Sequence, residues 1–383
     1  MFDPKRPYND LPPLPPQTSV QTPAILNKCI SASRALAGLR FAGQLTPDQG
    51  VLIQTIPNLE ARASSAIENI VTTNDALFRE QSLGASEATP ETKEAARCRA
   101  ALHLGVEQLK TRPLSARVAV DVCQTIKGVE LDIRTTPGTT LSNSHTGEVI
   151  YTPPEGEDLL RTLLANWEQY LHESREVDPL IRMAVLHYQF EAIHPFPDGN
   201  GRTGRILNIL CLIQARLLDL PTLYLSRYIL GARGDYYRLL GRVTSHQEWE
   251  PWIVYMLTGI EATSLWTTEK IKAIRALMDA TAAYVRAVAP KMPRDVVELI
   301  FMQPCCRIAT VVEHGIAKRE TASGYLKDLV AFGVLEEQKV GRDKIFLHRK
   351  YLDVLFSDDH TFTAYERRSP REAPGDMTRR GSA

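Results

Sequence analysis

The sequence lacks an excess of charge of either sign, because 45 lysine and arginine residues balance 45 aspartate and glutamate residues in a chain of 383. A chain with no net charge has no general electrostatic attraction to nucleic acid or to an anionic membrane. It also lacks an apolar run of the roughly 20 residues that a transmembrane helix needs. Its first residues lack the apolar core of a signal peptide. These absences argue against membrane and secreted proteins.

Cysteine is scarce, and its spacing shows neither a zinc site nor a disulfide framework. Cys211 lies within an apolar run and is expected to be a small core residue. This usage is typical of a reducing compartment, so we expect a cytoplasmic location. The six cysteines are Cys29, Cys98, Cys123, Cys211, Cys305 and Cys306.

One short segment, residues 194–205, holds groups suited to handling a polyphosphate beside a proton transfer. It combines a titratable base, a carboxylate, three glycines and two arginines within twelve positions. Few purely structural roles need that mixture. Its members are His194, Asp198, Gly199, Gly201, Arg202, Gly204 and Arg205.

The three glycines have the spacing of a dinucleotide-binding fingerprint, but that fingerprint follows a β-strand. Here residues 180–188 carry apolar side chains at helical spacing, and residues 206–213 are apolar almost throughout. We therefore predict a loop between two helices that closes on the N-terminus of the second. Because the first N–H groups of a helix lack internal partners and the helix dipole is positive there, such a loop is suited to binding an anion.

The side chains of this loop predict chemistry on a nucleotide. Arg202 and Arg205 offer forked donors for phosphate oxygens. Asp198 would repel phosphate unless a hard cation such as Mg²⁺ lay between them. His194 can take a proton near neutral pH. Taken singly, these residues would be a core histidine, a turn and surface arginines; together they predict attack of a hydroxyl on a nucleotide phosphate.

The segment resembles the motif of the Fic family, His-x-Phe-x-Asp/Glu-Gly-Asn-Gly-Arg-x-x-Arg, with every fixed position present. The resemblance extends over roughly residues 5–355, and residues 11–16, residues 223–229 and the C-terminal module resemble one bacterial subgroup. It implies transfer of AMP from ATP, with Mg²⁺, to a Ser, Thr or Tyr hydroxyl of a protein, the chain itself included. Pyrophosphate is the implied second product.

Roles follow from the resemblance position by position. His194 resembles the general base, and Asp198 resembles the Mg²⁺ ligand. Arg202 and Arg205 resemble the clamps for the β- and γ-phosphates. A relative that phosphorylates its target has Lys where this chain has Gly201, so Gly201 favours nucleotidyl transfer. The expected ATP-binding positions of the motif are Gly199, Asn200, Gly201, Arg202, Thr203, Gly204 and Arg205.

Residues 64–69 resemble the inhibitory helix of the family. Ser64 and Glu68 share a helix face at i and i+4, so Ser64 is expected to buttress Glu68. A bidentate pair between Glu68 and Arg205 would occupy the partner of the γ-phosphate and leave ATP misplaced. Glu68 is therefore counted with the ATP site as well, and Ser64, Glu68 and Asn69 imply self-inhibition.

Two further segments complete the expected site. Residues 140–152 predict a β-hairpin that turns at Gly147. By resemblance it is the flap that pairs with an extended target segment by strand addition. Residues 224–237 are expected to form one side of the adenosine pocket, with Tyr228 and the backbone of Gly231 as contacts. Many relatives carry Asn or Gln in place of Gly231.

Four nearby residues are expected to support the structure instead of binding ligands. Phe196 anchors the loop in the core, and Arg134 precedes the hairpin. Trp249 and Trp252 pack between helices.

The predicted fold is mainly α, with a Fic helical core, a β-hairpin flap and a C-terminal winged helix-turn-helix domain. The last assignment follows from helical segments at 307–314 and 318–332 before a hairpin at 334–347. The Pro-rich start is expected to be extended, either wrapping a surface or loosely ordered. The predicted parts are a Pro-rich segment 1–23, a helical region with the inhibitory helix 24–110, a catalytic core 111–265, a connecting helix 266–290, a winged helix 291–356 and a disordered tail 357–383.

Alternatives to a self-inhibited adenylyltransferase stay open at this point. One is a DNA-binding regulator whose Fic core senses ATP, and another is a de-AMPylase in which Glu68 positions water. Basic residues of the winged helix could contact DNA phosphates, but neighbouring acidic residues weaken the positive field that DNA binding needs. A scaffold or homodimer role is therefore favoured. The basic candidates are Lys318, Arg319, Lys327, Arg342 and Lys344, and the acidic ones are Glu313, Glu320, Asp328, Glu336 and Glu337.

Overall fold

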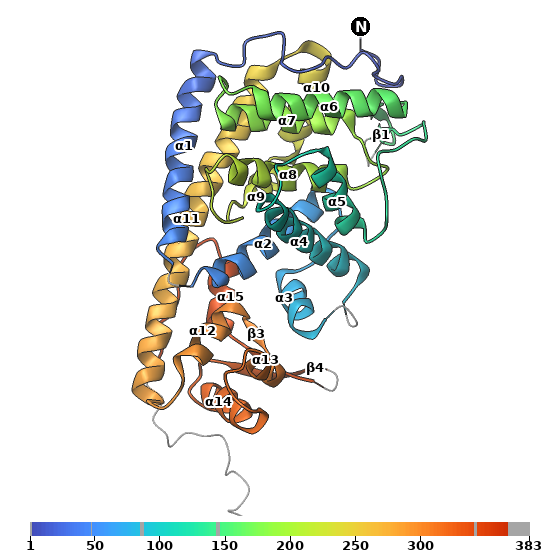
Figure 1. The fold of residues 1–383 in the computed structure, drawn as a ribbon. Coiled ribbons are helices and arrows are strands. Elements are labelled where there is room, and N and C mark those ends of the chain that lie inside the picture. Colours follow the sequence, from blue (N-terminus) through green and yellow to red (C-terminus); the bar gives the residue numbers. More distant parts are fainter. Residues whose placement is uncertain (1, 47, 85–87, 143–145, 341–342, 367–383) are drawn as a thin grey trace, which may run out of the picture. The chain divides into compact units, whose positions relative to one another are not determined.

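The computed structural model describes residues 2–46, 48–84, 88–142, 146–340 and 343–366 (Figure 1). The chain forms two compact units that divide after Thr268. The structure is mainly helical, as predicted. None of the described helices combines the length and apolar character that a membrane crossing requires.

The first unit is built from helices around α7 and α8, with a short hairpin. The helix α11 begins in this unit and runs on past its boundary as one 40-residue helix. The elements are α1 (Pro23–Gln44), α2 (Gln49–Ile67), α3 (Asn74–Leu83), α4 (Pro90–Leu109), α5 (Ala116–Lys127), β1 (Leu141–Ser142), β2 (Val149–Tyr151), α6 (Glu157–Glu173), α7 (Pro179–Ile193), α8 (Asn200–Gln214), α9 (Leu225–Gly231), α10 (Arg233–His246) and α11 (Trp249–Val288).

The helices α7 and α8 are buried along nearly their whole length, as the apolar sequence on both sides of the motif predicts. Asp178 caps α7 by accepting from the N–H of Leu180 at 2.8 Å, and Pro179 is the first helical residue. The tryptophans predicted to pack between helices are buried, and the Trp252 indole donates to a carbonyl of α7 at 2.8 Å. Trp249 packs edge-on against Tyr188 of the same helix. The core of the unit therefore fixes α7, the helix that leads into the motif.

The Pro-rich segment before α1 lies along the surface of the first unit without regular secondary structure. Leu11 and Leu14 are buried in it. The Asn166 side chain on α6 bonds to both backbone groups of Leu14, at 2.7 and 2.9 Å. Of the two expectations for this segment, wrapping a surface is the one that the contacts match.

The predicted hairpin is present as β1 and β2, which pair antiparallel with Leu141 opposite Tyr151. Its strands are shorter than the alternation suggests, and residues 143–145 lie outside the described part of the chain. The Tyr151 hydroxyl donates to the carbonyl of Ala192 at 2.7 Å. This bond ties the hairpin to the end of α7, two residues before His194.

The second unit contains the helix, turn, helix and hairpin that the sequence predicts. A strand that the sequence did not predict, β3, pairs with β5, so the sheet order is β3-β5-β4. Two residues are too few to show a strand period. The predicted turn at residues 341 and 342 lies outside the described part. The elements are α12 (Arg294–Met302), β3 (Cys305–Cys306), α13 (Ile308–Glu313), α14 (Arg319–Ala331), β4 (Glu336–Val340), β5 (Asp343–Leu347) and α15 (Arg349–Phe356).

The prediction of a disordered tail from residue 357 is wrong for its first part. The Tyr365 ring stacks on Tyr284 at 4.8 Å, and its hydroxyl lies 3.0 Å from that of Thr281. One aromatic side chain therefore gives this polar segment an apolar contact. Residues 367–383 lie outside the described part.

Candidate active site

The motif begins at a strained turn that a buried arginine supports. His194 ends α7 with a left-handed φ of 50°, which is uncommon for a residue other than glycine. Arg134 donates from Nε to the His194 carbonyl at 2.8 Å and from Nη2 to the Pro154 carbonyl. Its backbone N–H donates to Pro195 at 2.8 Å. The structural role expected of Arg134 is therefore to hold the turn on which His194 stands.

The His194 ring is held in its neutral form. Burial, followed by the positive charge of Arg134, lowers the pKa of His194 to about 4. At physiological pH the ring therefore carries no charge and can accept a proton. Within the described part of the chain, its buried Nδ1 atom makes no hydrogen bond of ordinary geometry.

The loop then closes on α8 through Asn200 and Gly199. The Asn200 side chain accepts from the N–H of Phe196 at 2.8 Å and donates to its carbonyl at 2.7 Å. Asn200, expected among the phosphate-binding positions, thus uses its side chain to brace the turn, and Phe196 is buried as predicted. Gly199 has a φ of 84°, which suits glycine. Among the described residues no side chain caps α8, so its first N–H groups can face an anion.

Two expected ATP-binding positions face the protein interior instead. Thr203 is fully buried, and its N–H donates to the Gly199 carbonyl at 3.0 Å. A Cβ atom on Gly204 would lie 2.5 Å from the Glu191 Oε1 atom, so Gly204 permits close packing of α8 against α7. The contacts that the structure shows therefore turn both Thr203 and Gly204 toward the protein and not toward a nucleotide.

Asp198 lies at the exposed side of the loop, with 60% of its side chain accessible. One oxygen accepts from the N–H of Gly199 at 2.6 Å, and the other pairs with Lys127 at the end of α5. Burial by itself would raise the pKa of Asp198, but the hydrogen bond and charge of Lys127 outweigh it and hold that pKa below its usual value. The carboxylate is therefore ionised.

A single ionised carboxylate of this kind fits Mg²⁺ bound largely through phosphate and water oxygens. Among the described residues no cluster of three or more His, Cys, Asp or Glu side chains could hold a metal ion by itself. An ion at Asp198 would therefore depend on oxygens supplied by a nucleotide.

Glu68 caps the end of α2 and divides its carboxylate between two buried arginines. Its Oε2 atom accepts from Arg202 Nε at 2.7 Å, and its Oε1 atom accepts from Arg205 Nη2 at 2.8 Å. The arginine side chains are 1% and 2% exposed. The expected bidentate pair with Arg205 alone is therefore wrong. Residues three apart on a helix share a face, so both arginines of α8 reach the same carboxylate.

Ser64 contacts Arg205, and not Glu68 as expected. Its hydroxyl accepts from Arg205 Nε and its carbonyl accepts from Nη2, both at 2.8 Å. Asn69 follows Glu68 with a φ of 63° and accepts from Arg233 at 2.8 Å, which ties the end of α2 to α10. The residues of the expected inhibitory helix thus hold Arg205 and anchor the helix that carries them.

Gly201 lies directly beneath the Glu68 carboxylate. A Cβ atom at this position would lie 2.5 Å from the Glu68 Oε1 atom. Glycine therefore lets the carboxylate reach Arg205 across the first turn of α8.

Sequence reasoning missed three charged residues of the site. Glu94 of α4 accepts from Arg202 Nη1, and Lys127 bridges Glu94 and Asp198. On α2, Glu60 accepts from the N–H of Ser226 at 3.0 Å and from its hydroxyl. Glu60 lies four and eight residues before Ser64 and Glu68, so its helix face carried a signal for it. Glu94 and Lys127 had no such signal.

The expected adenosine contacts lie on α9, which packs against α2. Tyr228 packs on Tyr255, with ring centres 5.1 Å apart. Gly231 ends α9, and apart from its chain neighbours and its own helix no atom of the described residues lies within 4 Å of a Cβ atom built on it. Of the contacts shown in the described residues, none joins Tyr228 or Gly231 to the motif, so both assignments stay predictions.

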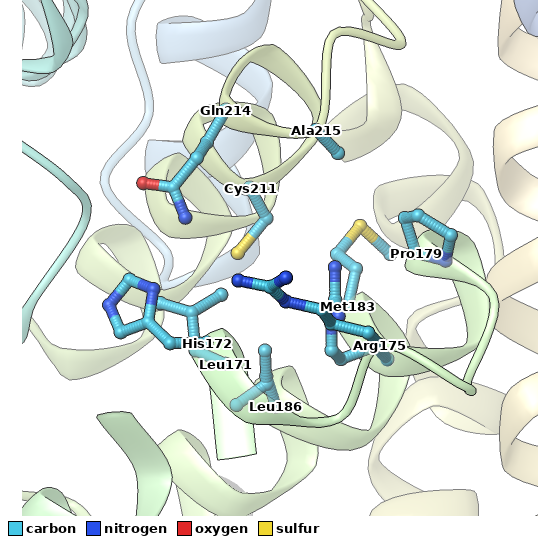
Figure 2. Close-up of a pocket in the computed structure, with 10 residues that line it drawn as sticks. Leu171, His172, Arg175, Pro179, Met183, Leu186, Cys211, Gln214 and Ala215 are labelled. Atoms are coloured by element: carbon cyan, nitrogen blue, oxygen red, sulfur yellow. The ribbon is translucent and has the colours of Figure 1, made fainter. Parts of the chain in front are cut away.

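A cavity of about 190 Å³ lies at the opposite end of α8 (Figure 2). The ends of α6, α7 and α8 line it, with Arg175 and Met183 at its wall and the Cys211 sulfur pointing toward it. Residues 194–205 do not contribute to its lining, so this cavity is separate from the site above.

Three family descriptions match successive parts of the chain. "Fic/DOC family N-terminal" matches residues 26–107, and "Fic/DOC family" matches residues 121–212. "Protein adenylyltransferase SoFic-like, C-terminal domain" matches residues 277–351. The first covers Ser64, Glu68 and Glu94, and the second covers the whole motif.

Similar proteins agree with these matches. A probable protein adenylyltransferase of Aquifex aeolicus is 40% identical over 76 residues, which are 20% of this chain and 22% of the relative. The protein adenylyltransferase Fic of Nematostella vectensis is 32% identical over 114 residues, 30% of this chain and 25% of the relative. The chain thus spans a quarter or less of these curated relatives.

A solved structure supports the fold over a much longer stretch. The Fic family protein from Desulfovibrio desulfuricans G20 aligns with a TM-score of 0.56 and 23% identity. The alignment covers 87% of this chain and 98% of that one. The matched segments and the motif they contain agree with this fold: the chain contains the N-terminal and core domains of the Fic/DOC family, at residues 26–107 and 121–212.

Proposed function

We propose that the chain is a self-inhibited protein adenylyltransferase, which transfers AMP from ATP to a Ser, Thr or Tyr hydroxyl of a protein, itself included. The observation that carries this proposal is the neutral His194 ring placed beside the uncapped N-terminus of α8 and its two buried arginines. The names of the family relatives, which are protein adenylyltransferases, support it.

The chemistry assigns one task to each group. His194 takes the proton of the target hydroxyl as its oxygen bonds to the α-phosphorus of ATP. The bond from that phosphorus to the bridging oxygen breaks, and pyrophosphate leaves. The first N–H groups of α8 bind phosphate oxygens, while Arg202 and Arg205 stabilise the charge that develops on the leaving group.

Asp198 would hold Mg²⁺ together with the phosphates, and the ion would neutralise part of their charge. Lys127 occupies this carboxylate in the structure. The pair uses the Asp198 Oδ2 atom, so an ion bound to that oxygen would compete with Lys127 for it.

The hairpin would present the target. Its strand β2 is fixed to the Ala192 carbonyl through Tyr151, so a segment added to the hairpin edge would pass close to the end of α7. The hairpin side chain Ile150 is 48% exposed and is available to a partner.

The position of Glu68 supports the self-inhibition that we propose. Its carboxylate engages both arginines, so the donors that would meet the terminal phosphates are already occupied. ATP can settle in a reactive pose only after Glu68 withdraws. The inhibition is carried by the same chain, because α2 belongs to the same compact unit as the motif.

Labelled ATP tests the proposal. The full chain with Glu68→Gly is incubated with Mg²⁺ and ATP labelled at either the α- or the γ-phosphate. We expect stable protein label from the α-position and none from the γ-position. The same variant with His194→Ala is the control and should take up neither. Covalent label from the γ-position would replace adenylyl transfer with phosphoryl transfer.

A further inference from the structure

The two arginines of the motif share one restraint, Glu68, but Arg202 has a second one on another helix. Arg205 receives its hydrogen-bond acceptors from α2, namely the Ser64 hydroxyl and carbonyl and the Glu68 carboxylate. Arg202 is held by Glu68 and also by Glu94 of α4. Withdrawal of α2 would therefore release Arg205 from these acceptors but would leave Arg202 attached to Glu94.

The atoms that each carboxylate contacts show which part of Arg202 stays free. Glu68 binds Nε, and Asp198 Oδ1 lies 3.6 Å from Nη2; these two nitrogens form one edge of the guanidinium. Glu94 binds Nη1, which lies outside that edge. A phosphate bonded by two parallel N–H groups would use this edge, whose Nε donor Glu68 now occupies.

Arg202 has little freedom to move, because its side chain is 1% exposed. Its side chain therefore has no room to swing toward a nucleotide, so a phosphate would have to take the place of the Glu68 carboxylate. Glu94 is 21% exposed and lies 3.6 Å from the ammonium of Lys127. It thus has a second cation beside it that keeps its carboxylate in position.

We propose that Glu94 is a positioning residue: it fixes the orientation of Arg202 so that the Nε–Nη2 edge is already aimed at a phosphate when Glu68 withdraws. Glu68 is then the removable partner of that edge, and Glu94 is the permanent partner of the opposite nitrogen. This inference rests on the proposed function, since it takes the ligand to be a nucleoside triphosphate.

Nucleotide binding to the full chain with Glu68→Gly tests the role of Glu94. Dissociation constants for ATP and AMP are measured by calorimetry before and after adding Glu94→Gln. Without its anchor, Arg202 loses its fixed orientation, so we expect the dissociation constant for ATP to rise roughly tenfold. AMP lacks the β- and γ-phosphates, so its dissociation constant should stay within about twofold. A purely structural role of Glu94 would weaken both ligands together.

Two further variants complete the design. Glu91→Gln makes the same change one turn earlier on α4, outside the cluster, and should bind ATP like the Glu68→Gly parent. Glu94→Asp keeps the charge but shortens its reach, so it should lie between parent and Glu94→Gln, and it decides the matter if Glu94→Gln fails to fold.

Unchanged or tighter ATP binding by Glu94→Gln would overturn the inference and make Glu94 a second restraint on Arg202. Failure of the Glu68→Gly parent itself to bind ATP would instead overturn the proposed function, and this inference with it. Comparing the Glu68→Gly parent with the Glu68→Gly, Glu94→Gln double variant therefore distinguishes failure of this inference from failure of the proposed function.

Discussion

His194 is constrained in both its backbone and its ring. The left-handed turn is held by Arg134, and the ring is neutral because burial and that same arginine disfavour the charged form. A histidine prepared in this way can accept a proton but is poorly suited to carrying a charge in the resting state. This fits a base that acts only when a hydroxyl is presented.

Replacing His194 by alanine should abolish transfer and leave nucleotide binding nearly intact. In the Glu68→Gly background, loss of a general base is expected to slow labelling by about 10²–10⁴-fold. ATP affinity should change little, because the anion site is made by α8. Label uptake and calorimetry measure the two effects. His246→Ala, on the exposed end of α10, is the matched control, and an active His194→Ala variant would refute the assignment.

Replacing Glu68 by glycine should raise self-labelling by roughly 10²-fold, since misplacement of reacting groups by about 1 Å carries a cost of that order. Removing the carboxylate frees the Nε donor of Arg202 and relieves Nη2 of Arg205 of one acceptor. Initial rates at saturating ATP and Mg²⁺ provide the measurement. Glu130→Gly, on an exposed loop, should behave like the native protein. Equal rates for Glu68→Gly and native protein would leave Glu68 without an inhibitory role.

For single residues, the sequence predicted the members of the site that lie together in one segment. It missed the members that lie far from that segment in the chain. His194, Asp198, Arg202 and Arg205 lie in one segment, so their spacing alone brings them together. Glu94 reaches Arg202 across 108 positions, and Lys127 reaches Asp198 across 71. Such pairs depend on how helices pack, and no local pattern encodes that. The sharing of Glu68 between two arginines was missed for the same reason.

Among the elements, α2 carries its polar groups as a set. Glu60, Ser64 and Glu68 follow one another at intervals of four, and each meets a partner on α8 or α9. Glu60 bonds to the backbone and side chain of Ser226, close to the start of α9. The helix proposed to inhibit is thus attached to the helix expected to border the adenosine.

The attachment of α2 through Glu60 should depend on pH. Burial raises the pKa of Glu60 from 4.5 to about 7, so the protonated carboxyl is favoured in the folded state. The resulting stability is complete below about pH 4.5 and is lost as the pH rises through 7. Glu60→Gln cannot ionise, so its melting temperature should rise relative to that of the native protein over this range.

Thermal melts at several pH values check the prediction, with Glu130→Gln as the control that should follow the native protein. A melting-temperature difference between Glu60→Gln and native protein that stays constant with pH would mean that Glu60 does not titrate in this way.

Element prediction succeeded where apolar periodicity was long and failed where it was short. The two helices around the motif were predicted because their buried faces extend over most of their length. The two-residue strand β3 and the contacts of Tyr365 were not, since each depends on a partner far away in sequence.

For the whole molecule, the charges of the C-terminal unit are partly paired with one another. Two basic side chains of its hairpin region pair with acidic neighbours, Lys344 with Glu337 and Arg349 with Glu336. Arg342, another of the basic candidates, lies outside the described part of the chain. The match to a C-terminal domain of an adenylyltransferase gives no reason to add nucleic acid as a ligand.

We therefore expect the full chain to bind duplex DNA with a dissociation constant of about 10⁻⁶ M or weaker at physiological salt. That value is the tight end of the range for nonspecific binding. Fluorescence anisotropy with a labelled duplex measures this, and a basic DNA-binding protein serves as the positive control. Nanomolar, salt-dependent affinity would restore the DNA-binding alternative.

The charges around Arg202 have a consequence for how fast a nucleotide arrives. In the resting state three cations face three carboxylates, so the mouth of the site offers no net attraction to a polyanion. Removing Glu68 leaves one positive charge in excess, and an approaching nucleotide would then be drawn in by a field that salt screens. Association of ATP should accordingly be slow and nearly indifferent to ionic strength in the native chain, and faster and sensitive to salt once Glu68 is gone. Withdrawal of the Glu68 carboxylate would thus change the rate at which ATP associates as well as the position that ATP takes in the site. The six groups are Lys127, Arg202 and Arg205 against Glu68, Glu94 and Asp198.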